Sequence, residues 1–155
     1  MALKITSNSF AYGQPIPSKY TCDGQNINPP LSISGVPAGT KSLVLIMEDP
    51  DIPDFVKDKF GIDLWDHWIV WNIPVETKDI LEGTSPEGVH GRNTRGNNAY
   101  GGPCPPDGTH RYFFYLYALD TQLSLKEGAA KSDVLKVMNG HVLAKAEHMG
   151  VYQRI

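Results

Sequence analysis

The chain has 155 residues and a mass of 17.1 kDa, which predicts a single domain over residues 1–155 with a core of its own. Hydrophobic residues make up 41% and charged residues 20% of the chain, a composition that excludes an intrinsically disordered protein. The formal net charge of -3 argues against a nucleic-acid-binding domain. No apolar run approaches the roughly 20 residues of a membrane span, and the N-terminus lacks the apolar core of a signal peptide. The sequence therefore predicts a cytoplasmic protein without integral membrane association.

Only two cysteines are present, Cys22 and Cys104, and both lie in loops rich in Gly, Pro and Asp. This number excludes a framework of several disulfides and a zinc site with four cysteine ligands. Two separate thiols are the favoured interpretation for a cytosolic chain, and a bridge between them is the alternative.

Three short segments predict the central strands of a mainly β fold: Lys41–Met47, His67–Ile73 and Arg111–Ala118. They are rich in β-branched and aromatic residues, and turn residues flank each one. Both alternating faces are apolar, as expected for strands that are covered on two sides. The spacing favours two packed antiparallel sheets over alternating β-α units.

The run from Glu82 to Gly108 is too long for a simple connection and too rich in Gly, Asn and Pro for a strand. Loops of this length inside a compact domain are usually functional or disordered. Since this one ends in a segment stiffened by proline, we interpret it as functional.

Helix is expected only late in the chain. Ser124–Glu127 has the spacing of a capping box that opens a short helical turn. A longer helix is predicted over Asp133–His148, with Ser132 as its N-cap and Gly150 as its stop. The apolar residues near helical spacing in it are Val134, Leu135, Met138, Val142 and Ala146.

Polar side chains stand at the ends of the three predicted central strands. Asp49 follows the first, and His67 and His110 open the other two. By the alternation of side chains along a strand, His110 shares a face with Tyr112. By the same count, His67 shares a face with Ile69 and Trp71. The strand ends predict a pocket at the rim of the sandwich that gathers all three polar groups.

These groups suit a small anion. Asp49 beside either His67 or His110 would raise the pKa of that imidazole and favour its cation. The imidazolium, the Tyr112 hydroxyl and the backbone N–H groups from Gly108 to His110 would then donate hydrogen bonds to a phosphate or carboxylate. The sequence therefore predicts a binding site for a small anionic ligand.

Enzymatic interpretations have less support. The chain lacks a Gly-x-Ser-x-Gly elbow, a Walker motif and a dinucleotide-binding glycine pattern. Asp49, His67 and His110 are the ligand types of a facial metal triad, but they lack short metal-ligand spacing. We therefore predict a non-enzymatic protein with no cofactor and keep a metal-dependent enzyme as a weaker alternative.

Several motifs, spread almost end to end, resemble the phosphatidylethanolamine-binding protein family, also called the Raf kinase inhibitor protein family. The strongest are Asp-Pro-Asp-x-Pro at Asp49–Pro53 and Gly-x-His-Arg-Tyr at Gly108–Tyr112, supported by Tyr100–Pro106. The chain looks most like the prokaryotic YbhB/YbcL-type branch. The resemblance implies a Greek-key β-sandwich with a C-terminal helix and a small anion pocket at one end.

The family's pocket positions fall on Asp49, His67, His110 and Tyr112, with Pro105 in the wall. The resemblance also implies inhibition of a kinase or a serine protease as an alternative function, and a homodimer. The bulky segment 54–64 is a departure from the family pattern, and we expect it to narrow or cover the pocket.

Overall fold

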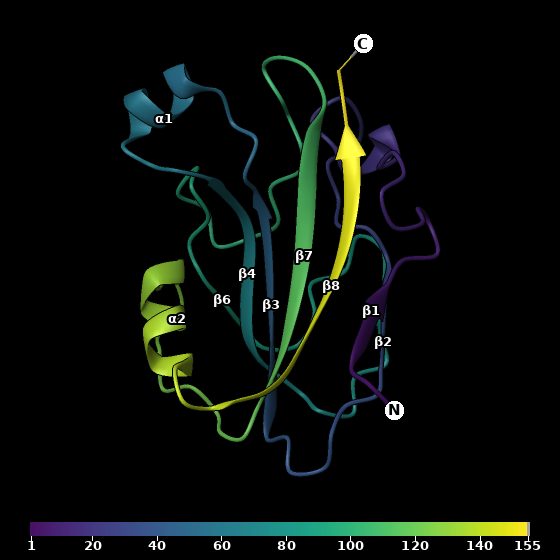
Figure 1. The fold of residues 1–155 in the computed structure, drawn as a ribbon, viewed down its shortest axis with the longest axis vertical. Helices are drawn as coiled ribbons and strands as arrows, with labels where there is room; N and C mark the ends of the chain where they lie inside the picture. Colours follow the sequence, from purple (N-terminus) through teal and green to yellow (C-terminus); the bar gives the residue numbers. More distant parts are fainter. Residues whose placement is uncertain (155) are drawn as a thin grey trace.

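The computed structural model describes residues 1–154. Its strands form two antiparallel β-sheets that pack face to face (Figure 1). The five-stranded sheet has the order β6 (Val89–His90), β4 (Trp65–Ile73), β3 (Ser42–Asp49), β7 (His110–Leu119) and β8 (Val142–Tyr152). The three-stranded sheet has the order β1 (Lys4–Thr6), β2 (Leu31–Ser34) and β5 (Asp79–Ile80). The short helices are η1 (Ser18–Tyr20), α1 (Asp54–Phe60) and α2 (Lys131–Met138).

The predicted mainly β fold and its three central strands are confirmed as β3, β4 and β7. The larger sheet also has the expected Greek-key order. β3, β4 and β6 lie side by side in chain order, and β7 returns to pair with the open edge of β3. This return places β3 at the centre of the sheet, where nearly all of its side chains are buried on both faces.

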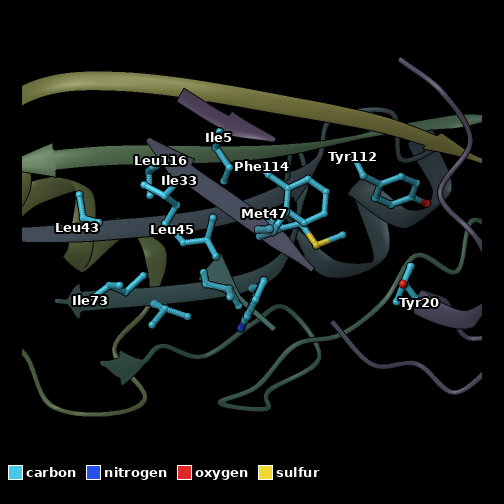
Figure 2. Close-up of a cluster of buried hydrophobic side chains, with 14 of the residues drawn as sticks. Ile5, Tyr20, Ile33, Leu43, Leu45, Met47, Ile73, Tyr112, Phe114 and Leu116 are labelled. Carbon is cyan, nitrogen blue, oxygen red and sulfur yellow. The ribbon is translucent and has the colours of Figure 1, made fainter. Parts of the chain in front are cut away.

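Two apolar layers cover β3. On the inner face, Leu45 and Met47 meet Ile33 of the smaller sheet (Figure 2). On the outer face, Ile46 packs in a second cluster with Val134 and Met138 of α2. Apolar side chains thus cover both faces of the five-stranded sheet at β3.

The predicted helix over Asp133–His148 is wrong beyond its first turns. α2 ends at Met138, before Gly140 with its φ of 86°, and Val142–Tyr152 forms β8 instead. β8 pairs with β7 along almost its whole length, and this pairing satisfies an edge that a helix would leave open. Tertiary pairing therefore outweighs the helix propensity of Leu, Ala, Lys and Glu in this segment.

Two further details of that prediction are corrected. Ser132 is not the N-cap, because α2 begins at Lys131 after Ala130. Gly150 is not a helix stop but lies within β8, where a Cβ atom would come within 2.5 Å of Ile16. The glycine is required for close packing.

The helical turn predicted at Ser124–Glu127 is also absent. The preceding Leu123 is tied to the side chain of Asn72 by two hydrogen bonds of 2.8 and 2.9 Å, through its N–H and its carbonyl oxygen. These bonds hold the chain extended against β4. In the described part of the chain, no helix has the length and apolar character needed to cross a bilayer.

Candidate functional site

The strand ends meet as the sequence predicts. Since β3 runs antiparallel to both β4 and β7, its last residue, Asp49, lies beside their first residues. Asp49 is in register with Trp65, and its carboxylate reaches His110. Three segments that are distant in sequence thereby supply one end of the sandwich.

His67 reaches this site through an irregularity that the sequence did not show. Simple alternation placed it on the face of Ile69 and Trp71, and that prediction is wrong. The register of β4 against β3 shifts between Asp66 and Trp68, so His67 occupies a bulge. Its ring turns to the inner face and meets Tyr112 edge-on, with 5.3 Å between ring centroids.

A cavity of about 250 Å³ opens at this end of the sandwich. Asp49, His67 and Tyr112 supply its buried polar side chains, from β3, β4 and β7, and the exposed Arg95 also lines it. One wall is the segment Gly102–Pro106, including the predicted Pro105, and the opposite wall is apolar and includes Phe60. These three side chains are buried, so each of their hydrogen-bonding groups needs a partner in the protein or in the cavity.

Asp49 and His110 form a buried pair behind the cavity. His110 Nδ1 lies 2.6 Å from Asp49 Oδ2, and Asp49 Oδ1 accepts a 2.7 Å bond from the N–H of Asp51. Burial alone would lower the pKa of His110, but its hydrogen bonds with Asp49 and Asp107 outweigh burial and raise it. Of the two histidines considered as partners of Asp49, the structure selects His110.

The pKa of His67 shifts in the opposite direction to that of His110. Burial lowers its pKa to about 4, and the positive charges of Arg95 and His110 act in the same direction. Its Nδ1–H donates to the carbonyl of Gly101 at 2.7 Å, which leaves Nε2 as an unprotonated acceptor at neutral pH. The imidazolium that the sequence analysis assigned to either histidine therefore belongs to His110.

This state of His67 predicts acid sensitivity. The folded pKa lies below the unfolded value of 6.5, so the stabilisation is complete above pH 6.5 and is lost as the pH falls toward 4. We expect the contribution of His67 to fall by about 3 kcal/mol over this window. Urea unfolding between pH 4 and 7.5 of the wild type and of His67→Gln checks this, because the variant should lack that part of the slope. Equal slopes would contradict the neutral buried state.

Tyr112 carries the most informative polar atom of the site. Its side chain is fully buried, yet its hydroxyl has no hydrogen-bond partner among residues 1–154. Burial, with the nearby negative charge of Asp49, raises the pKa of Tyr112, so the hydroxyl remains a donor. A buried hydroxyl without a partner costs stability, and a ligand in the cavity would satisfy it.

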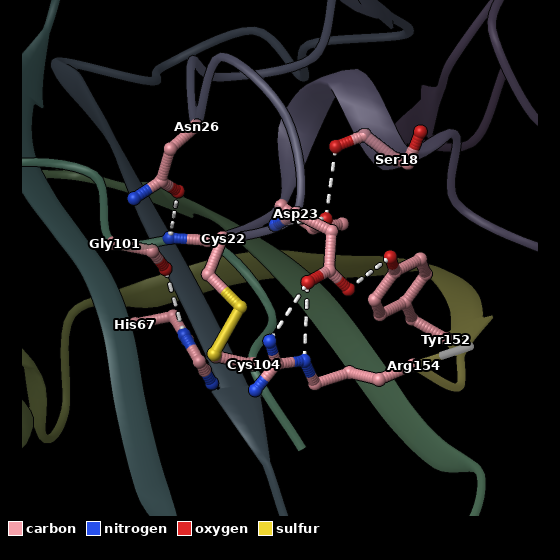
Figure 3. Close-up of a disulfide and its surroundings, with 11 residues drawn as sticks. Ser18, Cys22, Asp23, Asn26, His67, Gly101, Cys104, Tyr152 and Arg154 are labelled. Atoms are coloured by element: carbon pink, nitrogen blue, oxygen red, sulfur yellow. Dashed lines mark hydrogen bonds and ion pairs between the residues drawn. A yellow bond between two sulfur atoms is a disulfide. The ribbon is translucent and has the colours of Figure 1, made fainter. Parts of the chain in front are cut away.

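The Gly102–Pro106 wall is held against the N-terminal loop. The N–H of Gly102 donates to Asn26 Oδ1 at 2.8 Å, and the N–H of Cys22 donates to the carbonyl of Pro103 at 3.1 Å. A disulfide joins Cys22 to Cys104, with 5.4 Å between their Cα atoms (Figure 3). The interpretation as two separate thiols is therefore wrong, and the alternative, a bridge between the two cysteines, is confirmed.

Gly102 itself must be glycine. A Cβ atom there would lie 2.4 Å from the carbonyl oxygen of Tyr20 and 2.2 Å from Asn26 Oδ1. The wall and the N-terminal loop can approach this closely only without a side chain at this position.

The segment 54–64 borders the cavity, as expected. It contains α1, whose Val56 and Phe60 line the opening. Phe60 meets Trp65 edge-on at 5.1 Å, and the guanidinium of Arg95 lies 5.9 Å from the Trp65 ring. The sequence does not mark Arg95 as a site residue beyond its place in the loop interpreted as functional.

One predicted residue lies elsewhere. Gly108 is exposed and lines a separate depression with Asp107 and Arg154, not the cavity. The neighbouring Arg111 forms a two-pronged ion pair with Asp51 at 2.8 Å, outside the cavity.

The metal alternative gains no support. Within residues 1–154 no three His, Cys, Asp or Glu side chains are grouped so as to hold a metal ion. Of the three candidate ligands, His110 is hydrogen-bonded through both ring nitrogens, Nδ1 to Asp49 and Nε2 to Asp107, which leaves it no lone pair for a metal ion.

Residues 6–153 match the family model described as phosphatidylethanolamine-binding protein. The chain belongs to the phosphatidylethanolamine-binding protein family. A solved family homologue from Chlamydia trachomatis, CT736, is 50% identical over 99% of both chains, with a TM-score of 0.94.

A second solved structure, Escherichia coli YbcL, is described as a new member of the mammalian family and is 32% identical over the whole of both chains, with a TM-score of 0.87. Carboxypeptidase Y inhibitor, solved with its cognate proteinase, is 18% identical with a TM-score of 0.60. That alignment covers 99% of this chain and 83% of the inhibitor, and it shows the shared fold alone.

Proposed function

We propose that the protein is a non-enzymatic binding protein whose cavity holds a small anionic group, phosphate in character. The observation that carries the proposal is the buried, unpartnered hydroxyl of Tyr112 at a cavity that the neutral imidazole of His67 also lines. Family membership supports the same conclusion, because the family model is named for a phospholipid with a phosphate in its headgroup.

The charges around the cavity favour an anion of low charge. Arg95 stands at the rim, and the His110 cation balances the Asp49 carboxylate behind it. Cys104, which lines the wall, is held in the disulfide and supplies no thiol nucleophile. These features support binding over catalysis.

Replacing Tyr112 by Phe tests the proposal. Since the hydroxyl has no partner in the free protein, its removal should leave the free energy of unfolding unchanged or raised. The affinity for phenyl phosphate should fall about tenfold, as expected for loss of one charge-assisted hydrogen bond. Isothermal titration and urea unfolding measure the two effects.

Tyr117→Phe is the matched control, because Tyr117 lies on the same strand with its side chain on the outer face, packed against the cluster beneath α2. This control should bind like the wild type. Unchanged affinity in Tyr112→Phe, or equal losses in both variants, would contradict a site at the cavity.

Inhibition of a kinase or serine protease stays a prediction, as does the homodimer. For an inhibitor that acts through its loop surface, Tyr112→Phe would inhibit as well as the wild type. Light scattering of the purified protein measures its oligomeric state.

The cytoplasmic location also stays a prediction, and the Cys22–Cys104 bridge bears on it. Disulfides persist mainly in oxidising compartments. Rapid alkylation of intact cells followed by mass spectrometry tests it: free thiols support the cytoplasm, and a bridged pair favours an oxidising compartment.

A further inference from the structure

The disulfide is the strongest attachment of one part of the cavity wall. The first two residues of the wall are each fixed to the N-terminal loop by one hydrogen bond. Among residues 1–154, the backbone of the following segment, residues 104–108, makes no hydrogen bond to another backbone group. The Cys22–Cys104 bridge therefore does most to hold this segment against the N-terminal loop.

The segment is stiff, but its far end is free to turn. Pro105 and Pro106 have fixed φ angles, so the segment keeps its shape when it moves. Gly108 is exposed and has a φ of 56°, and a Cβ atom there would meet nothing within 4 Å. Rotation at this glycine can carry the segment as a unit once the bridge is broken.

A small thiol can reach the bridge without unfolding the protein. Both cysteines are partly exposed, and Cys104 lines the cavity. Neither cysteine belongs to the buried apolar clusters that hold the sheets together, so the core stays packed when the bridge is broken. Exposed disulfides are the ones that are most readily reduced.

We propose that the Cys22–Cys104 bridge is a reversible redox switch that controls the cavity. The oxidised bridge holds the wall in place, and reduction by a small thiol, RSH, lets residues 104–108 move away. The thiolate of RSH attacks one cysteine sulfur, forms a mixed disulfide with it and expels the other cysteine as a thiolate. A second RSH then releases the first cysteine. In sum, the protein disulfide and two RSH give two cysteine thiols and RSSR, and the protons of RSH pass to the cysteines.

The moving segment also touches the buried ion pair of the site. Asp107 Oδ1 lies 3.2 Å from His110 Nε2, and Asp49 holds His110 Nδ1. Reduction should withdraw Asp107 and leave the Asp49 contact in place. Burial opposes the charge on His110, whereas its hydrogen bonds with Asp49 and Asp107 raise its pKa, so the loss of Asp107 should lower that pKa.

Glutathione buffers at pH 7.5, without denaturant, test whether the bridge opens. A rising ratio of reduced to oxidised glutathione should convert it to two thiols, and the reverse change should restore it. Alkylation followed by mass spectrometry counts the thiols. A bridge that stays intact in excess reduced glutathione is a structural disulfide and overturns the proposal.

Nitrogen-15 relaxation tests whether the wall moves. The order parameters of the Cys104 and Asp107 amides should fall from about 0.85 to below about 0.6 on reduction, whereas Leu45, at the centre of the sheet, should keep its value. Cys22→Ser is the matched variant, because it lacks the bridge: it should show the low values with and without glutathione. Unchanged values in the reduced wild type overturn the proposal, as does a fall that includes Leu45.

The titration of His110 by NMR gives a second readout. Its midpoint should lie at a lower pH in the reduced protein, and Asp107→Asn should produce the same change with the bridge intact. An unchanged midpoint on reduction would mean that the segment stays docked and would overturn the proposal.

Only the effect on binding rests on the proposed function. The reduced protein should bind phenyl phosphate at least about threefold more weakly than the oxidised protein, because a released wall must be ordered again on binding. Equal binding by both forms overturns control of the cavity by the bridge. If neither form binds, the proposed function fails, and the relaxation data still decide whether the bridge controls the wall.

Discussion

Replacing Cys22 and Cys104 together by alanine is expected to lower the free energy of unfolding by about 4 kcal/mol. The bridge spans 82 residues of sequence, and a cross-link that closes so long a loop removes much of the entropy of the unfolded chain. For a domain of this size the loss corresponds to a drop in Tm of roughly 12 °C.

Reduction of the disulfide in the wild type should lower its Tm by a similar amount, whereas the Tm of the double variant should not change with reductant. Calorimetry of both proteins, with and without dithiothreitol, makes the comparison. A wild type whose Tm does not change on full reduction would contradict a stabilising bridge.

The bridge also shapes the site. Cys104 belongs to the cavity wall, and the segment around Cys22 is held in turn by the C-terminal end of the chain. Asp23 accepts hydrogen bonds from Tyr152 at 2.6 Å and from Arg154 at 3.1 Å (Figure 3). We therefore expect the double variant to bind phenyl phosphate more weakly even at temperatures where it is fully folded.

Replacing Asp49 by alanine is the second change with a large expected effect, a loss of about 4 kcal/mol. The carboxylate accepts from both His110 and the N–H of Asp51, and its removal leaves two donors without an acceptor. Asp49→Asn is the matched variant: it keeps one acceptor oxygen and should lose roughly half as much.

The pH dependence of this stability loss tests whether the Asp49–His110 ion pair causes it. The raised pKa of His110 means that its stabilisation is present in full below its ordinary value of 6.5 and is lost as the pH rises through the raised value. The difference in unfolding free energy between wild type and Asp49→Ala should therefore be larger at pH 6 than at pH 9. A difference independent of pH would show that the carboxylate acts without the imidazolium.

The sequence predicts much of this fold because its central strands carry a strong local signal. β3, β4 and β7 are apolar on both faces, and covered strands need that pattern. β8 was missed because Leu143–Glu147 consists of good helix formers, and only the alternation of His148, Gly150 and Tyr152 signals a strand. Pairing with β7 decides its structure, and pairing is not visible in a local window.

The candidate site, too, could be predicted from the sequence only in part. The place of Asp49 at a strand end and the shared face of His110 and Tyr112 follow from alternation, and the structure agrees. The orientation of His67 depends on a bulge, which changes the face of a side chain without any marker in the sequence. The choice of His110 as the partner of Asp49 and the meeting of Cys22 with Cys104 depend on how distant segments pack together.

The most direct measurement is a crystal structure of the protein grown with phenyl phosphate. We expect the phosphoryl group inside the cavity, with one oxygen about 2.7 Å from the Tyr112 hydroxyl and another within hydrogen-bond distance of His67 Nε2. A cavity that stays empty at saturating ligand, or phosphate bound only on the outer surface of the loop, would contradict it.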